Sequence, residues 1–132
     1  MKNKLSCLLA LLIFLSVTGC IPRDYLLENM QKHSQSLYTY KALPSDKTLA
    51  AHKKVLLGVI ESSKNHNMLV PPGIYAEYGY YLLKENQLGE AEKYFLLEKG
   101  IYPESGVFMD RMIQSIEGHE SVSNEIKEGG DF

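Results

Sequence analysis

The first twenty residues constrain this chain most, because they decide which part of it is free to fold. Lys2 and Lys4 precede an almost wholly apolar run, residues 5–17. This run is too short to cross a bilayer comfortably, which takes about 20 residues. A positively charged start, a short apolar run and small residues before a cleavage point are typical of a secretory signal peptide. We therefore expect residues 1–19 to be removed as a signal peptide.

The residues at the cleavage point indicate a lipoprotein signal. Val17, Thr18 and Gly19 form the aliphatic, small and glycine pattern that precedes a lipid-accepting cysteine, and Cys20 follows them. We expect a lipid on the Cys20 thiol to anchor the chain to a bacterial membrane. A plain signal peptide with a chance cysteine is the alternative. Position 21 is Ile rather than the Asp that commonly retains lipoproteins at the inner membrane. In a Gram-negative cell this favours the periplasmic face of the outer membrane.

Removal of the leader also narrows the chemistry left to the mature chain. Cys7 leaves with the leader and Cys20 is consumed by the lipid, so no thiol remains for a disulfide, a nucleophile or a metal site. The loss of two lysines changes the formal net charge from −2 to −4. Nucleic-acid binding is therefore not expected, because it requires a basic surface.

The mature chain reads as one all-α domain, residues 20–117, followed by a flexible tail, residues 118–132. Apolar spacing and turn residues predict about five helices, over residues 24–40, 47–64, 72–84, 89–99 and 104–117. Ser45 or Asp46 can cap the second helix, and Gly100 is expected to stop the fourth. The tail contains little that can be buried.

Residues 72–105 carry the most specific pattern of the mature chain. They resemble one tetratricopeptide repeat, a helical hairpin of about 34 residues. The landmarks in register are Tyr75, Tyr78, Gly79, Ala91, Phe95 and Pro103, with Leu82 in place of a second tyrosine. Gly79 and Ala91 are small where the two antiparallel helices must approach closely. We expect residues 24–64 to form an irregular hairpin that stacks on this one.

We expect the repeat-like hairpin to offer a groove to a protein partner. Its predicted partner-binding residues are Tyr75, Tyr78, Leu82, Phe95 and Glu98, and the surface around Asp110 and Arg111 is a second candidate. Glu98 stands where the repeat usually has a small residue. We favour a solvated side chain there over an ion pair with Arg111, because exposed pairs contribute little stability.

Tyrosines crowd the third predicted helix at positions 75, 78, 80 and 81. They wrap around the helix, so some must leave its packed face, and tyrosine tolerates water at its hydroxyl. We predict that at least Tyr80 or Tyr81 is substantially exposed.

The spacing of residues in the sequence gives little support to a metal site or a catalytic site. No two of the histidines, His33, His52, His66 and His119, lie three or four residues apart, and the mature chain offers no thiol. His33 and His52 lie on predicted apolar helix faces, where tolerated or partner-bonded histidines are expected rather than ligands. No nucleophile elbow, zinc-protease motif or phosphate-binding loop occurs. We therefore expect no enzymatic activity, metal or cofactor.

The stretch from Val70 to Ile113 resembles a family of uncharacterised bacterial lipoproteins of about this length. The segments that carry the resemblance are residues 70–73, 75–79, 91–92, 94–95, 98–99, 102–105 and 108–111. The family's early Trp-Gly signature is absent here, and residues 37–40 stand in its place. In that family the gene typically lies beside those for a CsgG-type (curli-assembly-like) lipoprotein and another small lipoprotein. The resemblance implies an envelope assembly with those partners and no enzymatic activity.

These features predict a membrane-anchored accessory that binds or assembles other envelope proteins. A small-ligand carrier, or an accessory to a cell-wall enzyme, is the alternative, and a structural spacer is a third possibility. A shallow open face would favour protein binding, and a deep enclosed polar pocket would favour a ligand carrier.

The lipid anchor is directly testable. Replacing Cys20 by Ala removes the thiol expected to accept the lipid, which is the only thiol of the mature chain, so this variant should not be labelled by palmitate. Metabolic labelling of the two chains measures this. A Cys7→Ala variant should label like the native chain, and labelling of the Cys20→Ala chain at the native level would disprove the lipoprotein assignment.

Overall fold

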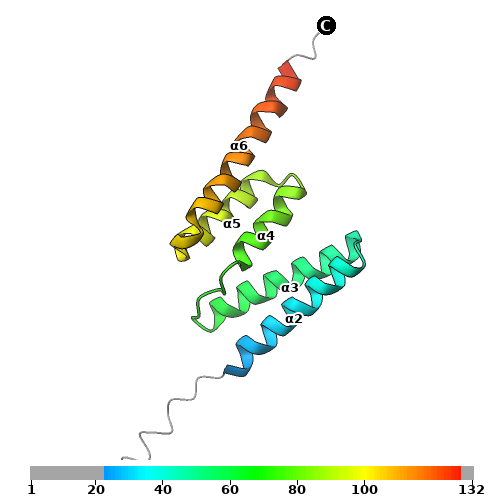
Figure 1. Cartoon of the computed structure of the whole chain (residues 1–132), viewed down its shortest axis with the longest axis vertical. Helices are drawn as coiled ribbons and strands as arrows, with labels where there is room; N and C mark the ends of the chain where they lie inside the picture. The colour runs from blue at the N-terminus through cyan, green and yellow to red at the C-terminus, as the bar shows by residue number, and fades with distance from the viewer. Residues whose placement is uncertain (1–22, 129–132) are drawn as a thin grey trace, which may run out of the picture.

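The computed structural model describes residues 23–128, and over that range the chain is helical, with no β-strand. Its elements, labelled as in Figure 1, are α2 (Arg23–Ala42), α3 (Asp46–Asn65), α4 (Ile74–Lys84), α5 (Leu88–Ile101), the 3-10 turn η1 (Pro103–Ser105) and α6 (Gly106–Glu128). The predicted all-α fold of about five helices is confirmed. The signal peptide and Cys20 lie outside the described residues.

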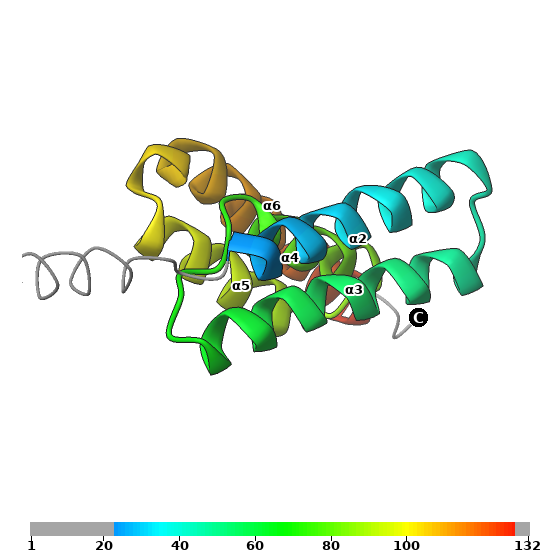
Figure 2. The ribbon, with the colours of Figure 1, turned by 90° about the horizontal axis from the view of Figure 1, so that it is seen from below.

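The helices form a stack in which each packs on its neighbours in the chain. Figure 1 shows α2 and α3 as one antiparallel hairpin, α4 and α5 as a second, and α6 running along α5 and beyond it. Helix α3 packs on α4 and so joins the two hairpins. The view in Figure 2 shows α2 and α3 lying across α4. Within residues 23–128, no helix combines the length and the apolar content that a membrane crossing needs.

Local sequence explains where α3 and α4 begin. Ser45 caps α3: its hydroxyl accepts the Thr48 N–H at 3.2 Å, while Thr48 Oγ1 accepts the Ser45 N–H at 3.0 Å. Gly73, which precedes α4, has a φ of 86°, a conformation that glycine adopts without steric cost. Helix α4 therefore starts at Ile74, after the two prolines, rather than at Pro72 as predicted.

Two predicted helix ends need correction. Gly100 does not stop α5, which continues to Ile101, where the Tyr102 N–H closes the last turn on the Glu98 carbonyl at 2.8 Å. Pro103 follows at once and starts the 3-10 turn. Helix α6 continues to Glu128, past the predicted end at Glu117, since no glycine or proline interrupts residues 119–128.

The core lies where the second hairpin meets α3 and α6. Its buried apolar residues are Leu56, Val59, Ile60, Val70, Ile74, Tyr75, Tyr78, Tyr81, Leu82, Ala91, Phe95, Met109 and Ile116. Helices α4 and α5 approach most tightly at Gly79, where a Cβ atom would lie 2.8 Å from Phe95 Cε1 and 3.1 Å from the Ala91 oxygen. This confirms the prediction that Gly79 and Ala91 are small because two helices approach closely there.

The close approach at Gly79 makes a stability prediction. Gly79→Leu should overpack the contact with Phe95 and lower the free energy of unfolding by about 1–3 kcal/mol. Thermal or denaturant unfolding measures this.

Gly58 provides the matched control, because a Cβ at this exposed position in α3 meets nothing within 4 Å. Gly58→Leu should leave stability unchanged or raise it by up to about 1 kcal/mol, since leucine has the better helix propensity. Equal stability of the two variants would show that the α4–α5 contact is wrongly placed.

Candidate functional site

The five residues predicted to form a partner-binding groove lie in the interior. The exposed fractions are 3 % for Tyr75, 9 % for Tyr78, 4 % for Leu82, 0 % for Phe95 and 2 % for Glu98. Helix α3 packs on α4 and helix α6 packs on α5, so these side chains are covered over most of their surface. The prediction of an open groove at these positions is corrected: Tyr75, Tyr78, Leu82 and Phe95 belong to the hydrophobic core, and Glu98 is a buried polar residue at the edge of a cleft.

Glu98 has a structural role that differs from both environments considered for it, a solvated side chain and an ion pair with Arg111. Its carboxylate accepts the backbone N–H of Gly73 at 2.7 Å and that of Ala76 at 3.4 Å. These N–H groups lie at the start of α4, where helical donors lack partners and the helix dipole favours negative charge. Glu98 therefore caps α4 from α5, and is neither solvated nor paired with Arg111. Arg111 is exposed.

The second predicted surface, around Asp110, lies on α6. Asp110 Oδ1 accepts a hydrogen bond from Lys99 Nζ at 2.5 Å, and both side chains are about half exposed. The ion pair ties α6 to α5 at the surface. Asp110 and Arg111 thus remain accessible, unlike the residues of the predicted groove.

The prediction for the tyrosines is confirmed by Tyr80. This side chain is 43 % exposed, whereas Tyr81 is 3 % exposed. Tyr81 points inward and makes an edge contact with the His52 ring, with 5.5 Å between centroids. Burial raises the pKa of Tyr81, and the nearby Glu77 carboxylate raises it further.

An open cleft lies where α4 and α6 begin, and we call it the Phe108 cleft. Its volume is about 400 Å³, and its lining residues are Pro72, Gly73, Ala76, Glu98, Tyr102, Glu104, Ser105, Phe108 and Met109. The Tyr102 hydroxyl donates to the Val70 carbonyl at 2.6 Å and holds one wall in place. Phe108 is 60 % exposed. The exposure of Phe108 could have been predicted from the sequence, because Phe108 is an apolar residue that lies outside the helix face formed by Met109 and Ile116.

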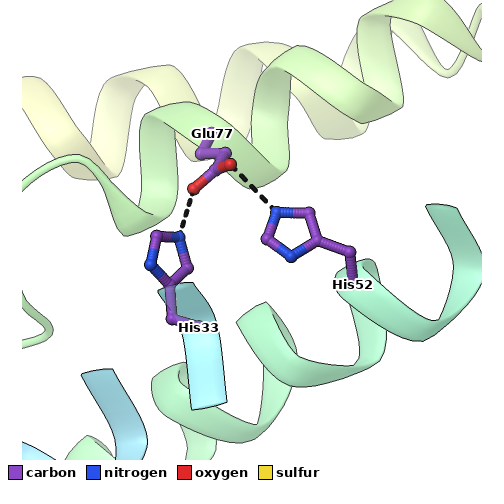
Figure 3. A group of neighbouring side chains, drawn as sticks. All are labelled: His33, His52 and Glu77. Carbon is purple, nitrogen blue, oxygen red and sulfur yellow. Dashed lines mark hydrogen bonds and ion pairs between the residues drawn. The ribbon is translucent and has the colours of Figure 1, made fainter. Parts of the chain in front are cut away.

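A polar cluster joins the two hairpins, and we call it the His–Glu cluster. Figure 3 shows its members, His33 from α2, His52 from α3 and Glu77 from α4, with the two imidazole rings turned toward the carboxylate. His33 Nε2 lies 2.6 Å from Glu77 Oε2, and His52 Nε2 lies 2.9 Å from Glu77 Oε1. Each residue comes from a different helix, so sequence spacing gave no sign of the cluster.

The surroundings of the cluster are mostly aromatic and enclosed. His52 is fully buried, its ring stacks on Tyr40 at an interplanar angle of 7°, and its Nδ1 lies 2.8 Å from Ser36 Oγ. Burial alone would raise the pKa of Glu77, but hydrogen bonds from His33 and His52 outweigh it and hold that pKa below its usual value. Glu77 is therefore a carboxylate that accepts from both imidazoles.

Ser36, His52 and Glu77 form a chain of hydrogen bonds that resembles a hydrolase triad in outline. The Ser36 hydroxyl lies 2.9 Å from the His33 carbonyl and 2.8 Å from His52 Nδ1. Because His52 donates its Nε2–H to Glu77, a neutral His52 has an unprotonated Nδ1, which accepts from the Ser36 hydroxyl. Ser36 also lies inside α2, where backbone N–H groups are engaged in helical bonds and supply no oxyanion hole. The arrangement therefore orients His52 and lacks the oxyanion hole that a nucleophile at Ser36 would need.

The sequence belongs to a known family. The family described as Domain of unknown function (DUF4810) matches residues 27–112, which span the His–Glu cluster and the Phe108 cleft. The chain is therefore a member of this family. No curated protein and no solved structure matches it.

The role of Glu98 can be tested by unfolding. Glu98→Ala leaves two N–H groups at the start of α4 without their charged acceptor, and should lower the free energy of unfolding by roughly 1.5–3 kcal/mol. Glu104→Ala is a matched control on an exposed glutamate and should change it by less than about 0.5 kcal/mol. If Glu98→Ala unfolds like the control, Glu98 is not a cap.

Proposed function

We propose that this protein is a lipid-anchored accessory of the bacterial envelope that binds another envelope protein through the Phe108 cleft. The observation that carries the proposal is Phe108 itself, 60 % exposed beside an open cleft of about 400 Å³. The anchor is the lipid expected on Cys20, and the periplasmic face of the outer membrane is its favoured location. In this proposal the protein is not an enzyme.

The shape and chemistry of this surface support a protein partner. Phe108 is joined by the neighbouring Val107, which is 71 % exposed, so the start of α6 presents two apolar side chains to solvent. Burying one such side chain in an interface is worth roughly 1.5–3 kcal/mol. The cleft opens on the surface, which is the shape that favours protein binding over a carried ligand.

The family resemblance supports a choice of partner. It implies an assembly with a CsgG-type lipoprotein and a second small lipoprotein, and we propose the CsgG-type lipoprotein as the occupant of the Phe108 cleft. We also propose that α4 and α5 are a single tetratricopeptide-like unit. The landmark contact between Gly79 and Phe95 supports this.

A second function, the carriage of a small ligand, has one observation in its favour. A cleft of about 530 Å³ lies between α2 and α3, and its lining includes Lys32, Lys47, Ser36, Thr39 and Thr48. The ammonium groups of Lys32 and Lys47 would attract an anionic ligand, and Lys32 also pairs with Glu28 at 2.7 Å. This cleft also opens to solvent, and it shares no lining residue with the Phe108 cleft. A substitution in one cleft therefore tests one function without touching the other.

Crosslinking in intact envelopes tests the proposed function. Phe108→Asp puts a charge at the rim of the cleft and should abolish crosslinks to the CsgG-type lipoprotein, identified by mass spectrometry. Leu96→Asp is the matched control, because Leu96 is an apolar residue on α5 that is 50 % exposed and does not line the Phe108 cleft. Equal crosslinking of both variants and the native chain would refute the proposal.

A further inference from the structure

The His–Glu cluster has the composition and convergence of a metal site. One candidate ligand atom from each of His33, His52 and Glu77 lies within 4.8 Å of the other two. We propose that these three residues bind a divalent transition-metal ion of the zinc type, with two imidazoles and one carboxylate as its protein ligands. The proposal is independent of the Phe108 cleft and of any partner that binds there.

The distances within the cluster suit such an ion. Zinc binds nitrogen at about 2.0–2.1 Å and carboxylate oxygen at about 2.0–2.2 Å, so ligand atoms around a tetrahedral ion lie roughly 3.3–3.5 Å apart. The two nitrogen-to-oxygen distances are now 2.6 and 2.9 Å. Small side-chain rotations would open this space, and the ion would replace the protons that the Nε2 atoms now present to Glu77.

A hydrogen bond between His52 Nδ1 and Ser36 holds the ring so that Nε2 faces the cluster. When Nε2 binds the ion, the ring proton moves to Nδ1, which then donates to Ser36 Oγ at 2.8 Å, while the Ser36 hydroxyl donates to the His33 carbonyl at 2.9 Å. Histidines that bind metals generally donate their other ring N–H to such a partner, which fixes the tautomer and the ring orientation. This leaves Nε2 of His52 to face the ion, on a ring held by stacking against Tyr40.

Exposure differs across the cluster and leaves one side open. The His52 side chain is fully buried, whereas the side chains of His33 and Glu77 are 14 % and 22 % exposed. A water molecule or an outside ligand can therefore reach a fourth position, as in zinc sites with three protein ligands. On the buried side of the cluster, the Tyr81 hydroxyl donates to Glu77 Oε1 at 3.5 Å.

The donor set also limits which ions fit. Two imidazoles with one carboxylate suit zinc, cobalt, nickel or copper, whereas calcium and magnesium prefer oxygen ligands throughout. Since the three ligands come from α2, α3 and α4, the ion would fasten the first hairpin to the second. Binding should therefore stabilise the folded chain in proportion to the logarithm of metal concentration.

Metal titration of the purified full chain, first stripped with a chelator, tests the proposal. Cobalt(II) should give the intense visible absorption of a tetrahedral site, saturating at one ion per chain, and zinc should displace it and raise the melting temperature. His33→Gln removes a partly exposed ligand and spares the buried His52, so this variant should fold. It should lose the cobalt spectrum.

Two further variants make the test specific. Ser36→Ala keeps all three ligands and should weaken binding by about 10–100-fold, through loss of the partner of His52. His66→Gln, a histidine outside the cluster, should bind cobalt as the native chain does. The absence of saturable binding, or an unchanged spectrum in His33→Gln, would overturn the proposal. A native chain whose melting temperature does not respond to zinc would also overturn it, and a lower melting temperature in Glu77→Gln would then show that the cluster is a hydrogen-bonded bridge only.

Discussion

The contact between Gly79 and Phe95 determines how the rest of the molecule is arranged around α4. A missing side chain at Gly79 lets α5 lie against one side of α4, with the fully buried Phe95 ring filling the contact. Glu77 stands two residues earlier, and residues two apart on a helix point in nearly opposite directions. The carboxylate is therefore presented to the first hairpin, away from α5. Gly79 thus faces α5, whereas Glu77 faces the first hairpin, which packs on α4 through α3.

Local pattern predicted most of the helices, because their signals lie within a few residues of one another. Met109 and Ile116 share one face by spacing alone and are buried on α6, and Ser45 caps α3 as serine does before many helices. Glu98 could not be placed in this way. Its partners are backbone N–H groups 25 and 22 residues earlier in the chain, and only the packing of α5 against the start of α4 brings them within reach. The His–Glu cluster could not be predicted from the sequence for the same reason, because its three residues come together only when three helices pack.

The landmark aromatic residues of the repeat-like hairpin illustrate a limit on reasoning from repeats. In a long array such a hairpin is covered by similar units and shares a concave face with them. Here α3 and α6 cover it within one small domain, so Tyr75, Tyr78 and Phe95 are used for folding. The exposed aromatic side chains, such as Phe108 and Tyr80, lie outside the repeat pattern.

The position of the first residue of α2 has a mechanical consequence. Helix α2 begins at Arg23, so with a lipid on Cys20 only Ile21 and Pro22 separate the acyl chains from the folded domain. Three residue steps span at most about 11 Å, even when fully extended. The domain would then lie directly against the lipid headgroups, because the linker would be too short to let it move away from the membrane surface. Any protein it holds would have to come to the bilayer surface to be held.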